Sequence, residues 1–311
     1  MAIKKIMIHD YLVFEGDFSL DFCPGVNIFI GGNGTGKTTL LRCLYDLKTS
    51  YAQFVTNDSC KFITADCEKV NVMAETGTGA QECEWGTAVI SGETKNYVYI
   101  PEKDILEHAR GLLTFIEQKE TGFNRIYKDF LVNAQDVPTK VKTDLQNRIG
   151  QKITDIIGGA VFFNLNDGSF YTLKSDGLKI PFSNEASGFK KLGYLGLLIS
   201  NGQLEPGSIL IWDEPENSLN PELVPILIEI LLELSHYGIQ IFIATHNYIF
   251  SRYFDVRKDK NTEVLFHSLQ KTNTNIIINT SKNFLKLPEN HIEAANAELF
   301  KSVIQDAMAE A

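Results

Sequence analysis

The sequence has few cysteines, and no two of them form a CxxC pair. Its 311 residues include Cys23, Cys43, Cys60, Cys67 and Cys83. The last three lie close together, but their spacing fits no zinc-binding pattern and no histidine falls between them. An odd number of cysteines and the absence of a signal-peptide pattern argue against a disulfide-stabilised secreted scaffold. We therefore expect a reduced, cytoplasmic setting and no zinc site.

A long apolar run is also missing. The longest one, Val224–Leu234, is interrupted by Glu229 and Glu233 at helical spacing, which is typical of an amphipathic helix and not of a membrane span. Internal repeats and sustained heptads are absent as well. With 44% hydrophobic and 22% charged residues, the composition is that of a globular protein. We expect no association with a membrane.

Positive charge is scarce. The chain has 29 Lys and Arg against 39 Asp and Glu, which gives a net charge of -10. Because the phosphates of nucleic acids attract basic surfaces, this charge does not indicate nucleic-acid binding, although it does not exclude a local basic patch.

The first part of the chain has the pattern of strands. Apolar residues alternate in Ile3–Ile8 and again in Phe18–Phe22, which predicts a hairpin. Asn27–Ile30 follows as a buried strand. Residues 50–100 are rich in Thr, Val, Tyr and Cys with glycine breaks, and they predict short antiparallel strands.

From Pro101 the pattern changes to that of helices. Apolar residues recur at spacings of three and four in Asp104–Lys119, Phe123–Ala134 and Pro138–Ile157. The remaining predicted elements are strands around Phe162 and Tyr171, a helix over Leu192–Ile199, buried strands over Ile209–Trp212 and Ile239–Thr245, a helix over Pro221–Ser235, strands near Leu265 and Ile276, and a helix over Ile292–Met308. A helix between two buried strands is a βαβ-like order that suits parallel pairing, so we expect an α/β core.

A glycine-rich loop follows the predicted strand Asn27–Ile30. Gly31, Gly36, Lys37 and Thr38 satisfy the pattern GxxxxGK[ST]. In such a loop the glycines let backbone N–H groups wrap phosphates, the lysine reaches the terminal phosphates and the hydroxyl binds magnesium. The helix predicted to follow adds its partial positive charge. The loop predicts binding of ATP with Mg²⁺, and its nucleotide-binding residues are Gly32, Asn33, Gly34, Thr35, Gly36, Lys37, Thr38 and Thr39, with Thr38 as a metal ligand.

Two carboxylates end the predicted strand Ile209–Trp212. Open α/β sheets bind ligands at the carboxyl ends of their strands. Asp213 is therefore placed to hold magnesium, and Glu214 to polarise an attacking water as general base. A pair of solvated carboxylates at a strand end is the alternative.

A single imidazole ends the predicted strand Ile239–Thr245. His246 is placed to hydrogen-bond a γ-phosphate. Taken alone, a histidine after a strand is more often structural.

These motifs, in this order, resemble those of the ABC ATPase superfamily. Residues 31–38 correspond to Walker A and residues 209–214 to Walker B. Ser218-Leu219-Asn220-Pro221 is similar to the D-loop, and His246 matches the switch histidine. Ala186-Ser187-Gly188-Phe189-Lys190 resembles a degenerate LSGGQ signature followed by a helix.

The branch that the sequence resembles is that of RecF, SMC and OLD-like proteins. Ile8–Phe14 is similar to the first strand of that branch, although Leu12 stands where a basic residue is usual, so an adenine or DNA contact from there is doubtful. Tyr99–Leu106 is similar to a segment of compact AAA-family ATPases that serve bacterial anti-phage defence or DNA repair. Lys37 and Ser187 are 150 positions apart, which is too few for a long coiled-coil arm.

The resemblance implies an α/β P-loop NTPase fold. It is that of an ABC ATPase head, with a mixed and largely parallel core sheet, an antiparallel β subdomain and a helical lobe. The implied domains are residues 1–100 with Walker A, residues 101–204 with the helical lobe and signature, and residues 205–311 with Walker B, the D-loop and the switch histidine.

The implied function is that of an ATPase switch. In this family the signature residues Ser187 and Gly188, with Asn220 of the D-loop, would meet the nucleotide of a second subunit. ATP would then join two heads into a homodimer or a higher homo-oligomer, and hydrolysis by Glu214, with Lys37 and His246, would release them. The expected result is the gating of a separately encoded effector, a nuclease or another defence or repair component, because Asn247–Ala311 has no acid cluster suited to two metals.

Two other functions remain as alternatives. The nucleotide-binding subunit of a membrane ABC transporter shares all five motifs but predicts an intact LSGGQ and a readable Q-loop. Here no residue is assigned to the Q-loop, because Gln118 lies in a predicted helix and both Glu102 and Lys103 are candidates for its place. A module that binds ATP without turnover is disfavoured by Glu214 beside Asp213.

The helical region 101–157 is a candidate surface for reading out the nucleotide state. A solvated helical face is the plainer interpretation. Its basic residues are Lys119, Arg125, Lys128, Lys140, Lys142, Arg148 and Lys152.

Overall fold

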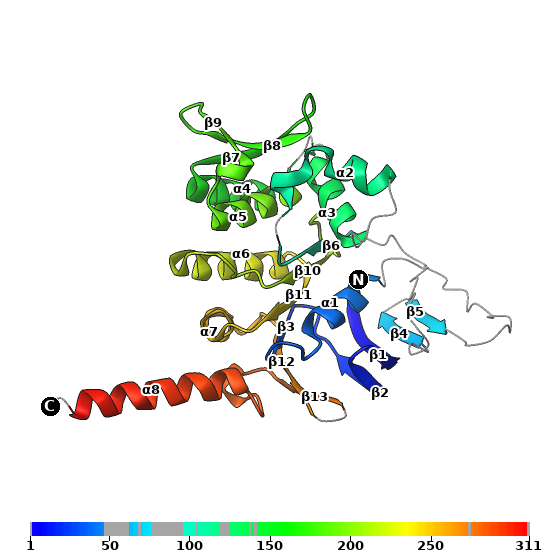
Figure 1. The fold of residues 1–311 in the computed structure, drawn as a ribbon, viewed down its shortest axis with the longest axis vertical. Coiled ribbons are helices and arrows are strands. Elements are labelled where there is room, and N and C mark those ends of the chain that lie inside the picture. Colours follow the sequence, from blue (N-terminus) through cyan, green and yellow to red (C-terminus); the bar gives the residue numbers. More distant parts are fainter. Residues whose placement is uncertain are drawn as a thin grey trace. The chain divides into compact units, whose positions relative to one another are not determined.

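The computed structural model describes most of the chain and divides it into two compact units (Figure 1). The described residues are 2–46, 62–67, 70–75, 96–103, 105–118, 125–136, 138–139, 142–272 and 275–309. Cys60, Cys83, Lys119 and Lys140 lie outside them, as does every part of residues 50–100 except 62–67, 70–75 and 96–100. One unit, here the terminal unit, is Met1–Thr94 with Ile241–Ala311, and the other, the middle unit, is Lys95–Gln240.

The terminal unit begins with an antiparallel sheet in the order β2-β1-β4-β5. Its strands are β1 (Ile3–Tyr11), β2 (Phe14–Asp21), β4 (Phe62–Cys67) and β5 (Val70–Glu75). Ile6 lies opposite Leu20 and Ile8 opposite Phe18, and all four side chains are buried. The predicted hairpin is confirmed, because alternation with a period of two places the apolar residues on one face.

A second run of strands in this unit has the order β13-β12-β3-β11. The strands are β3 (Val26–Ile30), β11 (Gln240–Thr245), β12 (Val264–Lys271) and β13 (Ile276–Ser281). Strand β3 is parallel to both β11 and β12, while β13 is antiparallel to β12. All five residues of β3 are buried, as expected of a strand flanked on both sides. The ring of Phe242 packs against those of Phe22 and Phe29 beside this strand.

Three α-helices complete the described part of the terminal unit. They are α1 (Lys37–Asp46), α7 (Tyr248–Arg257) and α8 (His291–Ala309), with the 3-10 helix η4 (Phe284–Lys286) before α8. Figure 1 shows α8 extending away from β12 and β13 of its own unit. Within the described residues, no helix of the chain combines the length and the apolar character that crossing a bilayer requires.

The middle unit contains a parallel strand pair and a set of helices. Strands β6 (Tyr97–Ile100) and β10 (Ile209–Asp213) pair so that Ile100 lies beside Trp212. The helices are η1 (Leu106–His108), α2 (Ala109–Gln118), α3 (Arg125–Gln135), α4 (Asp144–Ile157), η2 (Phe182–Asn184), α5 (Ser187–Ser200), η3 (Pro221–Leu223) and α6 (Val224–His236).

Helix α4 begins later than the sequence pattern predicts. Thr143 accepts a hydrogen bond from the Gln146 backbone N–H (3.2 Å), and the Gln146 side chain accepts one from the Thr143 N–H (2.8 Å). This capping box satisfies two N–H groups that a helix end leaves open, so the helix begins at Asp144 and not at Pro138.

A three-stranded antiparallel sheet packs against α5 and α4 in the middle unit. It contains β7 (Gly159–Asn164), β8 (Ser169–Lys174) and β9 (Lys179–Pro181), in that order. A Cβ atom at Gly193 of α5 would lie 2.6 Å from Val161 Cγ2, so glycine is needed for the close approach of α5 to β7. The sequence predicted β7 and β8 but not the short β9.

The two compact units cut across the three domains predicted from the sequence. The reason lies in strand pairing, since β11 and β12, far along the chain, flank β3 near its beginning. The predicted α/β class, with parallel and antiparallel sheets and helices, is confirmed.

Candidate functional site

The loop from Gly31 to Gly36 connects β3 to the N-terminus of α1. Gly34 and Gly36 have φ angles of 76° and 89°, in the left-handed region that side chains disfavour. The Thr35 hydroxyl donates to the Gly32 carbonyl oxygen (2.9 Å), which holds the turn closed. The left-handed backbone therefore favours glycine at Gly36, which the sequence motif specifies, and at Gly34, which it does not.

Neighbouring strands support this loop from behind. A Cβ at Gly36 would lie 2.8 Å from Val13 Cγ2 at the tip of the first hairpin, and one at Gly31 would lie 2.5 Å from the Leu269 carbonyl oxygen on β12. Both contacts are closer than real Cβ atoms tolerate. The loop is thus held by packing as well as by its own turns.

Lys37 is the first residue of α1 and is buried. Its ammonium group donates to the carbonyl oxygens of Gly31 and Gly32, both at 2.8 Å. Gly32, Asn33 and Gly34 are exposed, while Thr38 and Thr39 are half-buried. A fixed ammonium beside an exposed loop at a helix N-terminus is suited to binding an anion.

His246 follows β11 in the terminal unit. Thr245, the last residue of β11, lies beside Ile30, the last residue of β3, in parallel register. His246 and the glycine loop therefore leave the same edge of the sheet. The His246 side chain is exposed, and Asn247 caps α7 by accepting from the Phe250 N–H (3.0 Å).

Asp213 ends β10 in the middle unit and is almost fully buried, with 5% of its surface exposed. The Tyr99 hydroxyl lies within hydrogen-bond range of its Oδ2 atom, at 3.5 Å. Tyr99 is on β6, the neighbouring strand, so strand pairing places the two side chains together.

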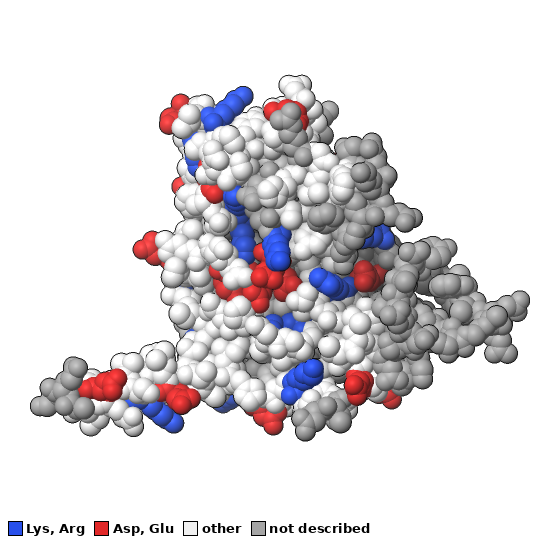
Figure 2. Space-filling model, in the orientation of Figure 1, with Lys and Arg blue, Asp and Glu red and all other residues white. Residues whose placement is uncertain are grey.

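Glu214 has an unusual backbone conformation for a residue with a side chain. Its φ angle is 48°, in the left-handed region. The Asn217 side-chain amide donates to Glu214 Oε2 (2.8 Å) and to Glu102 Oε1 (3.3 Å), and Lys191 Nζ donates to the Glu214 carbonyl oxygen (2.8 Å). Figure 2 shows acidic side chains gathered on the surface near β10. The hydrogen bonds from Asn217 and Lys191 hold Glu214 in this strained conformation.

The contacts to Glu214 involve residues that sequence reasoning did not identify. Asn217 and Lys191 belong to none of the motifs, and the sequence indicates Glu102 only as a candidate for the Q-loop position. The one indication in the sequence is the position of Asn217, three residues after Glu214, because Asn side chains often hydrogen-bond to nearby groups in turns.

The predicted signature and D-loop lie against each other in the middle unit. A Cβ at Gly188 would lie 3.1 Å from Leu219 Cδ1 and 3.4 Å from the Ser218 carbonyl oxygen. Ser187 begins α5 and is exposed, and Ala186 at the N-cap makes no side-chain hydrogen bond to the helix. Asn220 accepts from the Glu222 N–H (3.3 Å) and caps η3.

The predicted site residues therefore form two groups, one in each compact unit. The glycine loop, Lys37, Thr38, Thr39 and His246 belong to the terminal unit. Asp213, Glu214, Ser187, Gly188 and Asn220 belong to the middle unit. Among the described residues, no cluster of three or more His, Cys, Asp or Glu side chains is arranged to hold a metal by itself.

Basic side chains of the helical region mostly face acidic neighbours. Arg148 and Lys152 of α4 pair with Glu233 and Glu229 of α6, at 3.6 and 3.2 Å. Arg125 pairs with Asp129 one turn further along α3. These pairs support the plainer interpretation of a solvated, salt-bridged helical face.

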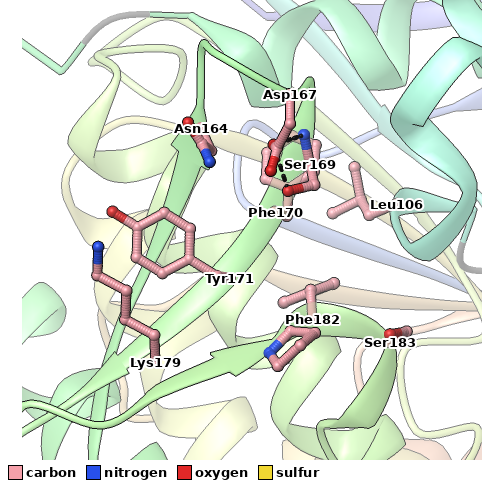
Figure 3. Close-up of a pocket in the computed structure, with 10 residues that line it drawn as sticks. Leu106, Asn164, Asp167, Ser169, Phe170, Tyr171, Lys179, Phe182 and Ser183 are labelled. Carbon is pink, nitrogen blue, oxygen red and sulfur yellow. Dashed lines mark hydrogen bonds between the residues drawn. The ribbon is translucent and has the colours of Figure 1, made fainter.

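A hollow of about 270 Å³ lies beside the β7-β8-β9 sheet, and its lining includes no motif residue (Figure 3). Asp167 accepts hydrogen bonds from the Ser169 N–H (3.0 Å) and hydroxyl (2.6 Å), and the Lys179 ammonium lies 5.1 Å from the centre of the Tyr171 ring. Four of the polar side chains that line the hollow are thus engaged in pairs, Asp167 with Ser169 and Lys179 with Tyr171.

Two family models match the chain. Residues 2–160 match an AAA domain model, and residues 105–251 match a second model with the description "AAA domain, putative AbiEii toxin, Type IV TA system".

Several solved structures are similar in fold. An SMC head bound to the C-winged helix domain of ScpA has a TM-score of 0.58 at 13% identity, and the match covers 94% of this chain and 100% of that chain. An SMC head domain with an extended coiled coil, bound to the C-terminal domain of ScpA from Pyrococcus furiosus, has a TM-score of 0.54 at 11% identity, over 90% and 96% of the two chains. An ATP-binding cassette of an ABC transporter in the ADP conformation has a TM-score of 0.45 at 17% identity, over 91% and 92%. The two SMC matches show that the chain has the fold of an SMC head.

Proposed function

The chain belongs to the AAA domain family, and from this membership and its SMC-head fold we propose that it is an ATPase that binds Mg-ATP at Gly32–Thr39 and hydrolyses it. The observation that carries the proposal is the Lys37 ammonium held on the carbonyls of Gly31 and Gly32, beside a loop whose left-handed positions, Gly34 and Gly36, are glycines. This arrangement suits the charge and the close approach of a triphosphate.

The residues present fit magnesium as well as nucleotide. The Thr38 hydroxyl and the Asp213 carboxylate are oxygen donors of the kind that Mg²⁺ prefers, and we assign both to it. Bound magnesium would neutralise charge on the phosphates. Lys37 then binds the terminal phosphates, and its burial lowers the reorganisation needed on binding.

Glu214 is the proposed general base. It would accept the proton of the attacking water, and Asn217 would hold its carboxylate in place. His246, which leaves the same sheet edge as the glycine loop, is assigned to the γ-phosphate.

We assign Ser187, Gly188 and Asn220 to the nucleotide of a second subunit. The support is the N-terminus of α5, where an alanine N-cap offers no side-chain acceptor for the N–H groups of the first turn and Ser187 is exposed. Such a helix end suits a phosphate. ATP would then join two heads, and hydrolysis would separate them.

The gating of a separately encoded effector is the remaining part of the proposal. Its support is indirect. Both SMC heads of similar fold are bound to a domain of another protein, ScpA. A nuclease or another defence or DNA-repair component is the class of effector that we propose.

The first test is the mass in solution of the Glu214→Gln protein with and without Mg-ATP. Removing only the general base should trap the closed state, so light scattering should show an ATP-dependent doubling relative to the nucleotide-free sample. The Lys37→Ala/Glu214→Gln protein is the control and should not respond to ATP. If the mass stays unchanged while equilibrium dialysis shows bound ATP, the proposed ATP-linked dimer is wrong.

A further inference from the structure

Helix α8 presents exposed apolar side chains along its second half. Each described residue from Glu298 to Met308 is exposed, whereas Ile292 and Asn296 nearer its start are half-buried. The large apolar residues are Leu299, Phe300, Val303, Ile304 and Met308, which are 60%, 58%, 55%, 57% and 75% exposed. Half or more of each of these side chains is in contact with solvent.

These five residues form one stripe. Their spacings of one, three and four place them within one half of the circumference of a helix with 3.6 residues per turn. The charged residues Glu298, Lys301 and Asp306 fall outside that arc. A stripe of this kind is typical of a helix that packs against a partner, because a helix that stays in water gains nothing from clustered apolar residues.

The size of the stripe matches a pairing between two copies. Each large apolar side chain leaves roughly 100 Å² exposed, so two paired helices would bury roughly 1,000 Å² in total. That value reaches the lower limit for a specific interface. The eleven exposed residues Glu298–Met308 would also be marginally stable as a helix without packing, and pairing would stabilise them.

We propose that α8 is a self-association surface through which two copies of the chain pair without nucleotide. The most economical arrangement is a two-fold one, in which the same stripe from both copies meets and no other surface is needed. This contact is separate from the proposed ATP-linked one, since none of the motif residues lies on α8.

The test compares two double variants of equal charge. Phe300→Asp/Ile304→Asp places two carboxylates in the stripe, and Ser302→Asp/Gln305→Asp places two on exposed positions outside it. In a nucleotide-free concentration series, sedimentation should show the natural protein shifting from 34.9 kDa towards twice that mass. The stripe variant should stay at 34.9 kDa, and the control should follow the natural protein.

Two outcomes overturn the proposal. If the natural protein stays monomeric at every concentration, the stripe does not mediate self-association. If the stripe variant still dimerises, the contact between the copies lies elsewhere. Circular dichroism checks that both variants keep their helices. Adding Glu214→Gln to the stripe variant separates this result from the proposed function, because Mg-ATP should still double the mass of that protein if only α8 pairing is lost.

Discussion

The glycine loop of the terminal unit and the segment Asp213–Asn220 of the middle unit are held in opposite ways. In the loop, the left-handed positions are Gly34 and Gly36, so the backbone takes its shape without strain. In the segment, the left-handed positions are Glu214 and Ser218, which have side chains. Their conformation is disfavoured by about 1–2 kcal/mol per residue, and the contacts of Asn217, Lys191 and Gly188 must offset it.

This difference indicates which substitutions should impair each of the two groups of site residues most. The loop depends on the buried Lys37 ammonium beside it and on a buried strand behind it, so the substitution of Lys37 should have the largest effect. The segment depends on several weaker side-chain contacts, so single changes there should be graded. The following four predictions test this contrast.

The largest effect is expected at Lys37. Lys37→Ala removes the ammonium beside the loop, and kcat/KM for ATP hydrolysis should fall roughly 100- to 1,000-fold, as expected for losing one preorganised donor. Steady-state ATPase assays measure it, with Lys271→Ala as an exposed lysine control. A fall of less than about tenfold would remove Lys37 from the proposed machinery.

The second effect concerns the strand behind the loop. His267 on β12 is fully buried, its Nδ1 lies 2.9 Å from the Thr280 hydroxyl, and rings of Phe22 and Phe29 surround it. Burial lowers the pKa of His267 from 6.5 to about 3. The unfolded chain therefore binds a proton below pH 6.5 that the folded chain does not, and stability falls as the pH falls from 6.5 towards 3.

Between about pH 7 and pH 5 this linkage should lower the free energy of unfolding by about 2 kcal/mol. Urea unfolding at both values measures it. Other groups titrate too, so the comparison is with His267→Gln, whose stability should change less over the same interval. Equal pH dependence in the two proteins would contradict the assignment, and His291→Gln, an exposed histidine, serves as control.

The third effect concerns Asn217. Asn217→Ala removes the amide that holds the Glu214 carboxylate, and kcat should fall about tenfold while KM changes little, since one hydrogen bond to a charged group contributes about 1.5 kcal/mol. In the Glu214→Gln background the same change should have almost no effect. An equal loss in both backgrounds would mean that Asn217 acts through some other group.

The smallest effect on stability is expected from two single substitutions, one in the loop and one in the segment, at positions with a left-handed backbone. Gly34→Ala should lower the free energy of unfolding by about 1 kcal/mol from backbone strain alone, because no atom lies within 4 Å of the added Cβ. Ser218→Gly should change it by less than that, since relief of strain is offset by the greater freedom of glycine in the unfolded chain. Thermal unfolding of both proteins shows which substitution changes the stability more. A larger change for Ser218→Gly would contradict the proposed difference between the loop and the segment.

Much of the fold could be predicted from pattern. Alternation in Ile3–Ile8 and Phe18–Phe22 predicted the first hairpin, and apolar runs predicted β3, β10 and β11. The start of α4 was missed because Pro138 looked like a natural helix start, whereas the capping box at Thr143 decides it. Strand β9 was missed because three residues are too few for a pattern.

The sequence by itself determined the glycine loop, the strand-end carboxylates and the α/β class, because each follows from residue types at short spacing. The tertiary structure alone decided that β11 and β12 flank β3, that Asn217 and Lys191 hold Glu214, and that Gly188 lies against Leu219. The physical reason is distance along the chain. Short-range sequence patterns reflect the backbone preference and the burial of each residue, whereas contacts between distant residues depend on how the whole chain packs.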